Sequence, residues 1–261
     1  MTPRPRVLVT GASGRIGVIL TDGLGDRYEI RGIDRRRDRS RGVRKVDLTR
    51  LRGLQRHFEG VDTVIDLAAY TSENAPWKPV YENNMAATIN VFQAAQLAGV
   101  RRVIYASSCH AAGMYEREEP YASICAGRYE GLDPERIQRL RGDVPARPDG
   151  PYGIAKAMGE AAGRWYAEEH GMSVICLRLG SVPREDRPAW VRAFATWLSY
   201  GDLLRLVEAC LQAPPEIGYR IYFGVSANTW RFWDVEQPRA EIGYEPQDDA
   251  ERRRTAAGTQ A

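Results

Sequence analysis

Five short apolar runs, separated by longer segments with helical spacing, restrict the possible fold of this chain more than any other feature. The runs are rich in Val, Ile and Leu and span residues 6–10, 29–33, 63–67, 102–106 and 173–179. Continuous apolar strands of this length are typical of parallel sheets, because helices cover both faces of such a sheet. The alternation therefore predicts an α/β fold with a doubly wound parallel sheet.

Apolar residues with helical spacing predict the elements between these strands. We expect helices over residues 15–24, 48–58, 80–98, 151–170, 189–200 and 202–213. Asp202 should cap the last of them. Residues 116–150 are rich in charge, Pro and Gly and predict a long connection. One short amphipathic piece over residues 133–140, capped by Asp133, should interrupt it.

Composition excludes several classes of protein. The net charge is +3, and the Arg residues are spread along the chain, so we expect no nucleic-acid partner. The run Arg35–Arg37 is either a solvated loop or a contact for a phosphate. No stretch approaches 18 apolar residues, which predicts no membrane span. Four well-separated Cys residues without a C-x-x-C pair indicate reduced thiols and a cytoplasmic protein.

A glycine-rich segment follows the first apolar run and opens a predicted helix. Gly11, Gly14 and Gly17 have G-x-x-G-x-x-G spacing, which allows a tight turn and close approach of a pyrophosphate to the helix N-terminus. Asp34 ends the second run, where a carboxylate would accept hydrogen bonds from adenosine ribose hydroxyls and repel a 2′-phosphate. These residues predict an NAD site, although Arg35–Arg37 could offset the repulsion; a tight turn without ligand is the alternative.

Tyr152 and Lys156 lie four residues apart in a predicted helix, so both side chains project from one face. Only three of the 37 Lys and Arg residues are Lys, which makes a lysine at this place notable. A charge at about 4 Å contributes roughly 4 kcal/mol at an effective dielectric of 20, enough to lower a phenol pKa by about two to three units. The pair predicts a tyrosine base, unless the spacing arose by chance on a surface helix.

Several further strings accompany these motifs. The general ones are TGASGRIG over residues 10–17, Asp47-Leu48, Leu67-Ala68-Ala69, Asn84, Ser107-Ser108 and Arg178-Leu179-Gly180-Ser181. More specific ones are Ala106-Ser107-Ser108-x-His110, DVPARPDG over residues 143–150, Arg192-x-x-x-Thr196-Trp197, Ser226-Ala227-Asn228 and Trp233-Asp234. Together they resemble an extended short-chain dehydrogenase/reductase of the NAD-dependent epimerase/dehydratase superfamily, and within it the bacterial uronate dehydrogenases.

The resemblance implies a Rossmann-like domain over residues 1–180 that binds NAD and carries the reactive residues. Residues 181–250 would form a small substrate-binding region packed on it, and residues 251–261 a disordered tail. Cofactor contacts are implied for Gly11, Ser13, Gly14, Arg15, Ile16, Gly17, Asp34, Asp47, Leu48, Leu67, Ala68, Ala69, Asn84, Tyr152 and Lys156. Nothing in the sequence indicates a metal ligand set.

The resemblance also implies four catalytic roles. Ser108 would hydrogen-bond the reacting oxygen, and Tyr152 would take its proton. Lys156 would hold the nicotinamide ribose and lower the Tyr152 pKa, while Asn84 would complete a proton path through a helix carbonyl.

Six residues would contact the sugar. Arg192, with help from Ser181, would bind a substrate carboxylate, since a guanidinium binds a carboxylate through two hydrogen bonds. The sugar hydroxyls would meet Thr71, Ser108, Cys109 and His110, although His110 and Ser181 each also suit a purely structural role. The chain departs from the family where Cys109 replaces an Asn and where residues 116–142 lengthen the connection, which would reshape the sugar pocket.

The resemblance therefore implies an NAD-dependent oxidoreductase that oxidises the C1 hydroxyl of a hexuronate, galacturonate or glucuronate, to give the aldarolactone. Another aldose 1-dehydrogenase, a nucleotide-sugar epimerase or dehydratase, and a non-catalytic NAD-binding protein are the alternatives. Only about 80 residues follow Ser181, which favours a small free sugar over a nucleotide diphosphate sugar. The resemblance also implies a homo-oligomer in which the helices near residues 80–98 and 151–170 pair between subunits.

Overall fold

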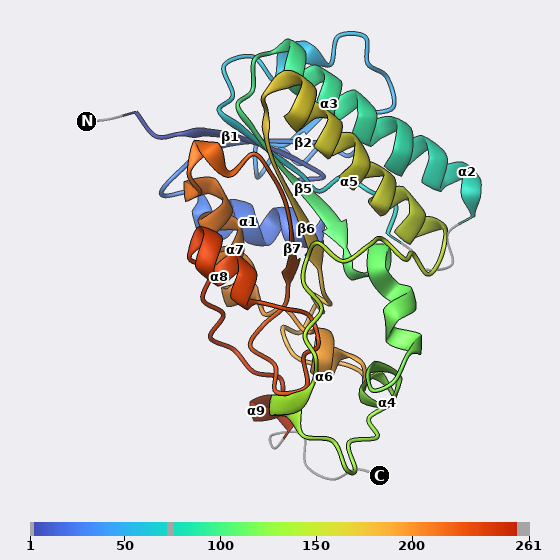
Figure 1. Cartoon of the computed structure of the whole chain (residues 1–261). Coiled ribbons are helices and arrows are strands. Elements are labelled where there is room, and N and C mark those ends of the chain that lie inside the picture. The colour runs from blue at the N-terminus through green and yellow to red at the C-terminus, as the bar shows by residue number, and fades with distance from the viewer. Residues whose placement is uncertain (1–2, 72–75, 255–261) are drawn as a thin grey trace.

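The computed structural model describes residues 3–71 and 76–254. Within these residues the chain forms one seven-stranded sheet of order β3-β2-β1-β4-β5-β6-β7 (Figure 1). Every neighbouring pair of strands is parallel, as predicted. The strands are β1 (Arg6–Thr10), β2 (Glu29–Asp34), β3 (Arg44–Lys45), β4 (Thr63–Asp66), β5 (Arg102–Ser108), β6 (Ser173–Leu179) and β7 (Tyr219–Gly224).

Helices cover both faces of the sheet. The longer ones are α1 (Arg15–Leu24), α3 (Ala87–Leu97), α5 (Pro151–His170), α7 (Tyr200–Gln212) and α8 (Glu236–Ile242). Shorter helices and turns are η1 (Gln55–His57), α2 (Trp77–Val80), η2 (Tyr81–Ala86), η3 (Cys109–Arg117), α4 (Tyr121–Cys125), η4 (Pro134–Arg136), α6 (Ala193–Thr196), η5 (Pro215–Ile217) and α9 (Glu251–Arg254).

Successive residues of one strand enter different cores. Val7 and Val9 of β1 pack with Leu203 of α7, on the face that α1 and α7 cover. Leu8, between them, packs with Phe92 of α3 on the opposite face. Side chains alternate across a strand, so a continuous apolar run supplies both cores at once. This confirms the predicted doubly wound α/β fold, which is Rossmann-like.

Two predicted helices are wrong. Over residues 48–58 only η1 is helical, because the Asp47 carboxylate accepts hydrogen bonds from the Thr49 amide and hydroxyl, and Gly53 has φ +77°. These contacts make turns of the segment. Over residues 189–200 only α6 and the first residue of α7 are helical, because the chain straightens after α6 to pair Trp197 with Ser181. Strands β3 and β7 were not predicted.

The cap of α7 also differs from the prediction. Ser199 is the N-cap, and its hydroxyl accepts a hydrogen bond from the Asp202 amide at 3.0 Å. Asp202 lies in the first turn instead, where a carboxylate is favourable near the helix N-terminus. The second predicted cap is confirmed: Asp133 accepts the Glu135 amide at the start of η4, although that helix has only three residues.

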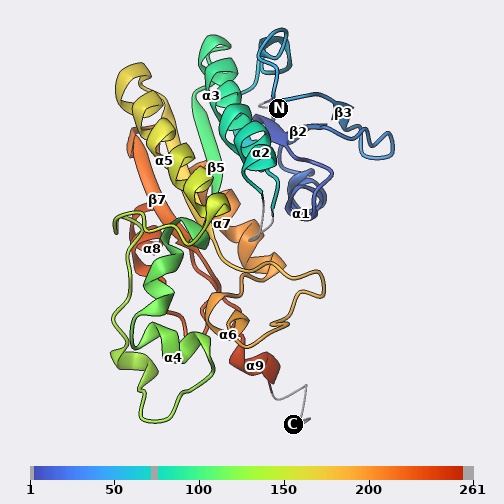
Figure 2. The same ribbon diagram turned by 90° about the vertical axis from the view of Figure 1, so that its right-hand side faces the viewer.

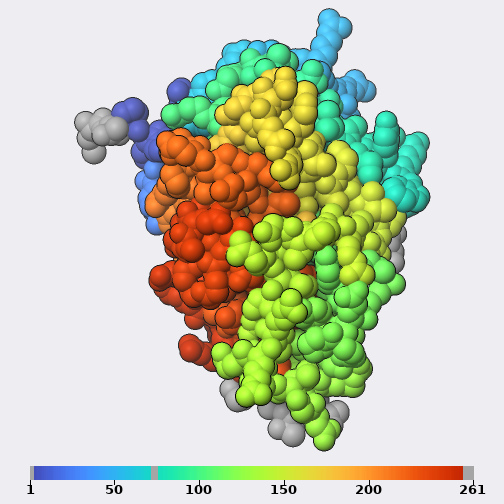
Figure 3. All heavy atoms as spheres, in the orientation of Figure 1, coloured from blue at the N-terminus to red at the C-terminus, as the bar shows by residue number. Residues whose placement is uncertain are grey.

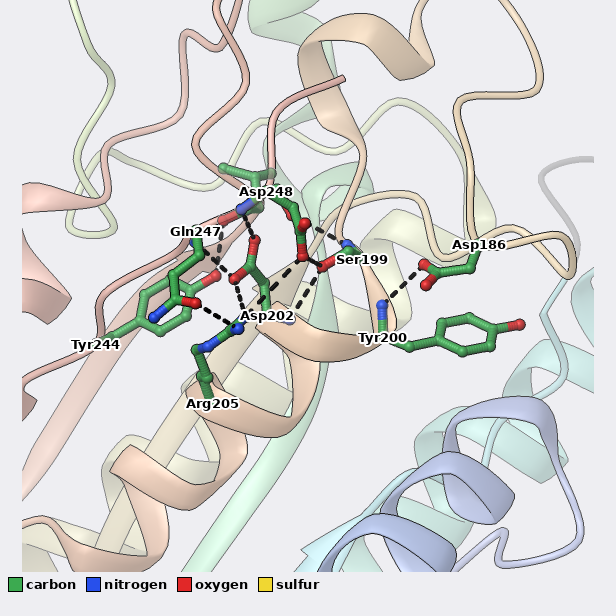
Figure 4. A network of polar contacts seen from close by, with 10 residues as sticks. Asp186, Ser199, Tyr200, Asp202, Arg205, Tyr244, Gln247 and Asp248 are labelled. Carbon is green, nitrogen blue, oxygen red and sulfur yellow. Dashed lines mark hydrogen bonds and ion pairs between the residues drawn. The ribbon is translucent and has the colours of Figure 1, made fainter. Parts of the chain in front are cut away.

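The C-terminal segment is held against the start of α7 (Figure 4). The carboxylate of Asp202 is fully buried and accepts hydrogen bonds from the amides of Gln247 and Asp248 at 2.8 and 3.0 Å. Arg205 donates to the same carboxylate at 2.7 Å, and Ser199 donates to Asp248 at 2.5 Å. These contacts fix residues 247 and 248 beside the start of α7.

The region beyond residue 180 is not separate from the sheet. Strand β7 pairs with β6, and α7 packs on α1, so both belong to the main layers. The division at residue 180 stays a prediction. Glu251–Arg254 forms α9, which corrects the expected disorder of those four residues, and residues 255–261 lie outside the described part. Among the described helices none has the length and apolarity needed to cross a membrane.

Figures 1 and 2 place α4, α6 and α9 together beyond the carboxyl ends of the strands. In the described part of the chain, the connection from β5 to α5 runs through η3, α4 and η4 across this end of the molecule. Its two ends pair with each other: the Met114 amide donates to Arg147 and the Arg147 amide to Ala111, both at 2.9 Å. The connection therefore starts and finishes beside the carboxyl end of β5.

Candidate active site

A cleft of about 1120 Å³ opens at the carboxyl ends of β1, β2, β4 and β5. Ligands of open α/β sheets bind at this edge. The cleft is lined by all the predicted cofactor residues except Asn84, and by Thr71 and Ser108 from the predicted substrate set. The structure thus brings together residues that are far apart in the sequence.

The turn between β1 and α1 requires its glycines. Gly11 has φ +63°, and a Cβ there would lie 3.0 Å from the backbone of Ala68. A Cβ on Gly17 would lie 2.7 Å from the Ala12 Cα. The helix N-terminus therefore opens directly into the cleft, where its amide groups favour a phosphate. The buried Ser13 hydroxyl has no hydrogen-bond partner among the described residues, so the turn fits the pyrophosphate of NAD.

Asp34 stands at the end of β2, where the adenosine ribose is expected. Its carboxylate accepts the Ser13 amide at 3.1 Å and the Arg36 amide at 3.0 Å. Each carboxylate oxygen keeps a second acceptor site, so ribose hydroxyls can still bind there. A 2′-phosphate would meet a negative charge held in place by the backbone, although Arg35 and Arg36 also line the cleft.

Ser108, Tyr152 and Lys156 meet at the inner end of the cleft. Ser108 ends β5, and its hydroxyl is close enough to the Tyr152 phenol to lower the pKa of Tyr152. Lys156 lies one turn further along α5, where its ammonium donates to the Ala106 carbonyl at 2.5 Å and lies 5.7 Å from the Tyr152 ring centroid. Because α5 begins with Pro151 and has its predicted bounds, the two side chains share one helix face.

The pKa values correct one sequence-based expectation. Burial raises the pKa of Tyr152, the neighbouring Cys109 acts in the same direction, and the Ser108 hydroxyl opposes this only partly. Burial lowers the pKa of Lys156 to about 8, against the charges of Asp66 and Glu160. The predicted lowering of the Tyr152 pKa by Lys156 is therefore not found in the protein alone, because burial raises this pKa and Lys156 is not among the groups that shift it.

Asn84 holds the backbone of the segment that follows β4. It is buried in the π-helical turn η2, where its amide oxygen accepts the Tyr70 amide at 2.6 Å and its nitrogen donates to the Tyr70 carbonyl at 3.1 Å. These two bonds hold the segment after β4, next to Thr71 at the cleft. π-Helical turns are frequent at functional sites. The role of Asn84 in a proton path stays a prediction.

Among the residues predicted to bind the substrate, Arg192 has the surroundings that differ most from the prediction. Its guanidinium donates through Nε and Nη2 to both carboxylate oxygens of Glu116, with the Nη2 bond at 2.6 Å. The same Nη2 lies 3.2 Å from the Cys109 sulfur. Burial raises the pKa of Cys109 despite the nearby Arg192, which keeps the thiol neutral. Glu116 was not predicted as a site residue.

His110 and Ser181, two further predicted substrate residues, are paired with neighbouring side chains of the protein. His110 Nδ1 is 2.7 Å from the Asp149 carboxylate, and its ring lies edge-on to Tyr152 at 5.9 Å. The Ser181 and Thr196 hydroxyls are hydrogen-bonded at 3.0 Å. Cys109, His110, Ser181 and Arg192 lie outside the lining of the main cleft.

A parallel sheet with a glycine-rich turn, a carboxylate at the end of the second strand and a Ser–Tyr–Lys group at one edge is typical of a class of nucleotide-dependent oxidoreductases. Residues 7–185 match the NAD dependent epimerase/dehydratase family, and the chain belongs to this family. The predicted family, the NAD cofactor and the assignment as an NAD-dependent dehydrogenase are thereby confirmed.

Relatives with different printed substrates are similar to the chain. The NAD-dependent glucose-6-phosphate dehydrogenase of Haloferax volcanii is 35% identical over 94% of this chain and 94% of its own length. The L-arabinose 1-dehydrogenase (NAD(P)(+)) of the same organism is 33% identical over 94% and 97%. The crystal structure of uronate dehydrogenase from Agrobacterium tumefaciens superposes with a TM-score of 0.81 at 29% identity, covering 99% of this chain and 91% of that one.

Proposed function

We propose that the protein oxidises the anomeric C1 hydroxyl of an aldose to the corresponding lactone with NAD as hydride acceptor. The observation that carries this proposal is the proximity of the Ser108 hydroxyl to the Tyr152 phenol, one helical turn from Lys156 and inside the cleft that fits NAD. Relatives that act on glucose 6-phosphate, arabinose and uronates support a sugar substrate.

The residues of the chain divide the reaction between them. NAD supplies the hydride acceptor when bound. The Ser108 hydroxyl orients the reacting C1 hydroxyl, and the Tyr152 phenolate removes its proton as the carbonyl forms. Lys156 supplies positive charge beside the phenolate and hydrogen-bond donors toward the ribose. Because burial raises the Tyr152 pKa, the base form becomes more abundant at alkaline pH, where turnover is expected to be faster.

Two classes of sugar are candidate substrates: a hexuronate and an aldose without a carboxylate. The hexuronate inferred from the resemblance, galacturonate or glucuronate, is supported by the guanidinium of Arg192 near Cys109. An aldose without a carboxylate is favoured by the pairing of Arg192 with Glu116. A nucleotide-sugar epimerase would use the same three catalytic residues but would release no reduced cofactor, which makes it separable by experiment.

The test is a panel of free sugars with NAD, followed by the absorbance of NADH. The panel contains galacturonate, glucuronate, glucose, arabinose and glucose 6-phosphate. We expect stoichiometric NADH formation with at least one of them and a higher kcat/KM with NAD than with NADP. NAD binding without NADH formation on any sugar would contradict the proposal, and a preference for NADP would contradict the role of Asp34.

We further propose a cytoplasmic homo-oligomer. The four cysteines Cys109, Cys125, Cys176 and Cys210 are free thiols, which suits a reducing compartment. Exposed aromatic residues on α2, η2 and α5 support association through these helices.

A further inference from the structure

Glu116 and Arg192 form a nearly enclosed ion pair. The side chain of Glu116 is 12% exposed and that of Arg192 is 21% exposed. Both carboxylate oxygens are engaged, since the Cys125 thiol also contacts Oε2 at 3.6 Å. A planar guanidinium binds one carboxylate through two parallel hydrogen bonds, and Glu116 takes that arrangement with Nε and Nη2. The edge of the Arg192 guanidinium formed by Nε and Nη2 is therefore occupied by the protein itself.

This ion pair lies next to the reacting groups. Arg192 Nη2 contacts the sulfur of Cys109, the residue that follows Ser108. Cys109 is in turn close enough to Tyr152 to affect its pKa. A sugar held by Ser108 and Tyr152 would thus reach toward the pair with its far end.

We propose that Glu116 determines the substrate specificity of this site by neutralising Arg192, so that the pocket selects aldoses without a carboxylate over hexuronates. The inference rests on the proposed sugar 1-dehydrogenase function and narrows it to a substrate class. Glu116 belongs to the long connection between β5 and α5, at the end of η3.

The preference has a simple electrostatic origin. A hexuronate would bring a second carboxylate beside Glu116, and two neighbouring negative charges repel strongly where water is scarce. To reach Arg192 it would have to displace Glu116, which would then lie partly buried without its cation. A sugar hydroxyl avoids both costs, because the oxygens of Glu116 retain acceptor sites for an O–H donor.

The experiment measures kcat/KM for glucuronate and for glucose, which share a ring and differ at C6. The wild-type protein should favour glucose. Glu116→Gln keeps the size of the side chain but removes its charge and leaves Arg192 free. We expect this variant to shift the glucuronate-to-glucose ratio of kcat/KM toward glucuronate by at least about tenfold, mainly through a lower KM for glucuronate.

Glu118→Gln is the matched control, because Glu118 belongs to the same connection and pairs with Arg147 at the surface. It should leave the ratio unchanged. Glu116→Asp withdraws the carboxylate by one methylene and should give a smaller shift in the same direction. It replaces Glu116→Gln in the test if that variant folds poorly. A wild-type preference for glucuronate, or an unchanged ratio in both Glu116 variants, would overturn the inference while leaving sugar oxidation in place.

A protein that oxidises no sugar would instead contradict the proposed function. In that event the inference is tested by calorimetry of glucuronate binding. Tighter binding to Glu116→Gln than to the wild type would support it, and equal binding would overturn it.

Discussion

Lys156 is a buried ammonium whose surroundings only partly compensate for its loss of water. Its side chain donates to the Ala106 carbonyl and lies 4.9 Å from the Tyr105 ring centroid. Among the neighbouring carboxylates, Asp66 stabilises the ammonium of Lys156 most, but burial raises the pKa of Asp66 itself to about 6. The ammonium therefore destabilises the folded chain in the absence of cofactor, which is common for groups that serve catalysis.

Stability should depend on pH through Lys156. Its folded-state pKa of about 8 lies below the ordinary value of 10.5, so the folded state binds fewer protons between these values than the unfolded state. The wild type should gain stability relative to Lys156→Met as pH rises through this interval, by up to about 3 kcal/mol at about 1.4 kcal/mol per pKa unit. Urea denaturation from pH 7 to 10.5 measures the difference.

The exposed Lys78 offers a control, since Lys78→Met removes an ammonium that the fold does not bury. Its difference from the wild type should stay constant with pH. A constant difference for Lys156→Met as well would show that its burial has no net cost.

Tyr152→Phe should remove turnover and preserve cofactor binding. The substitution deletes the hydroxyl that removes the substrate proton, a contribution of about 10² to 10⁴ in rate. The ring and its packing beside His110 remain, so the NAD dissociation constant should change less than about twofold. Stopped-flow NADH formation and calorimetric titration with NAD test the two parts separately. Retained turnover would eliminate Tyr152 as the base.

The sequence predicts the reactive residues better than their surroundings. Ser108, Tyr152 and Lys156 carry recognisable spacing and end or begin regular elements. Glu116 has no such signal: it lies in a charged, irregular connection, and its partner Arg192 is 76 residues away. The proximity of two charges so far apart follows from the tertiary fold alone.

Regular elements with clear ends were predicted most accurately. Strands β1 and β6 and helices α1 and α5 have the expected bounds, because each combines a strong apolar period with Gly or Pro at its start. Strand β7 was missed since Arg220 and Tyr219 interrupt its apolar run. Arg220 projects to the surface and pairs with Glu241 of α8 at 2.7 Å, a contact that the local pattern does not reveal.

The start of α7 should be sensitive to one isosteric change. Each carboxylate oxygen of Asp202 accepts one backbone amide, and Asp202→Asn keeps the shape of the side chain but replaces one of these oxygens with an NH2 donor. An unsatisfied buried amide costs about 1–3 kcal/mol, and the lost partner of Arg205 adds to it. We expect a lower free energy of unfolding and faster hydrogen exchange at the amides of residues 247 and 248.

Glu208→Gln is the control on the same helix, because Glu208 pairs with Arg27 near the surface. Such pairs contribute about 0–1 kcal/mol, so its effect should be small. Equal effects of the two variants would contradict the anchoring role of Asp202.

At the scale of the whole molecule, apolar side chains remain uncovered on one side of the sheet. Trp77, Tyr81 and Trp165 are 56%, 64% and 54% exposed, on α2, η2 and α5. Figure 3 shows α5 (yellow) along the outer surface of this side. Exposed aromatic residues of this kind favour contacts between subunits. This agrees with the association expected for the helices near residues 80–98 and 151–170.

Trp165→Glu should therefore reduce the mass of the protein in solution. We expect an oligomer for the wild type and a monomer, or a much weaker oligomer, for the variant in light scattering after size exclusion. Trp190→Glu is the matched control, since Trp190 is 49% exposed but lies outside these helices. A monomeric wild type at micromolar concentration would refute association through α5.

The chain leaves the sheet directly after Ser108 and re-enters helix α5 one residue before Tyr152. Pairing between residues 111–114 and Arg147 closes the base of this excursion. Its length can therefore change without displacing either reacting hydroxyl. After gene duplication, an insertion or deletion in this stretch could change the sugar specificity of the protein. Replacing the stretch with the corresponding segment of a relative could have the same effect in the laboratory. In both cases the catalytic residues keep their positions.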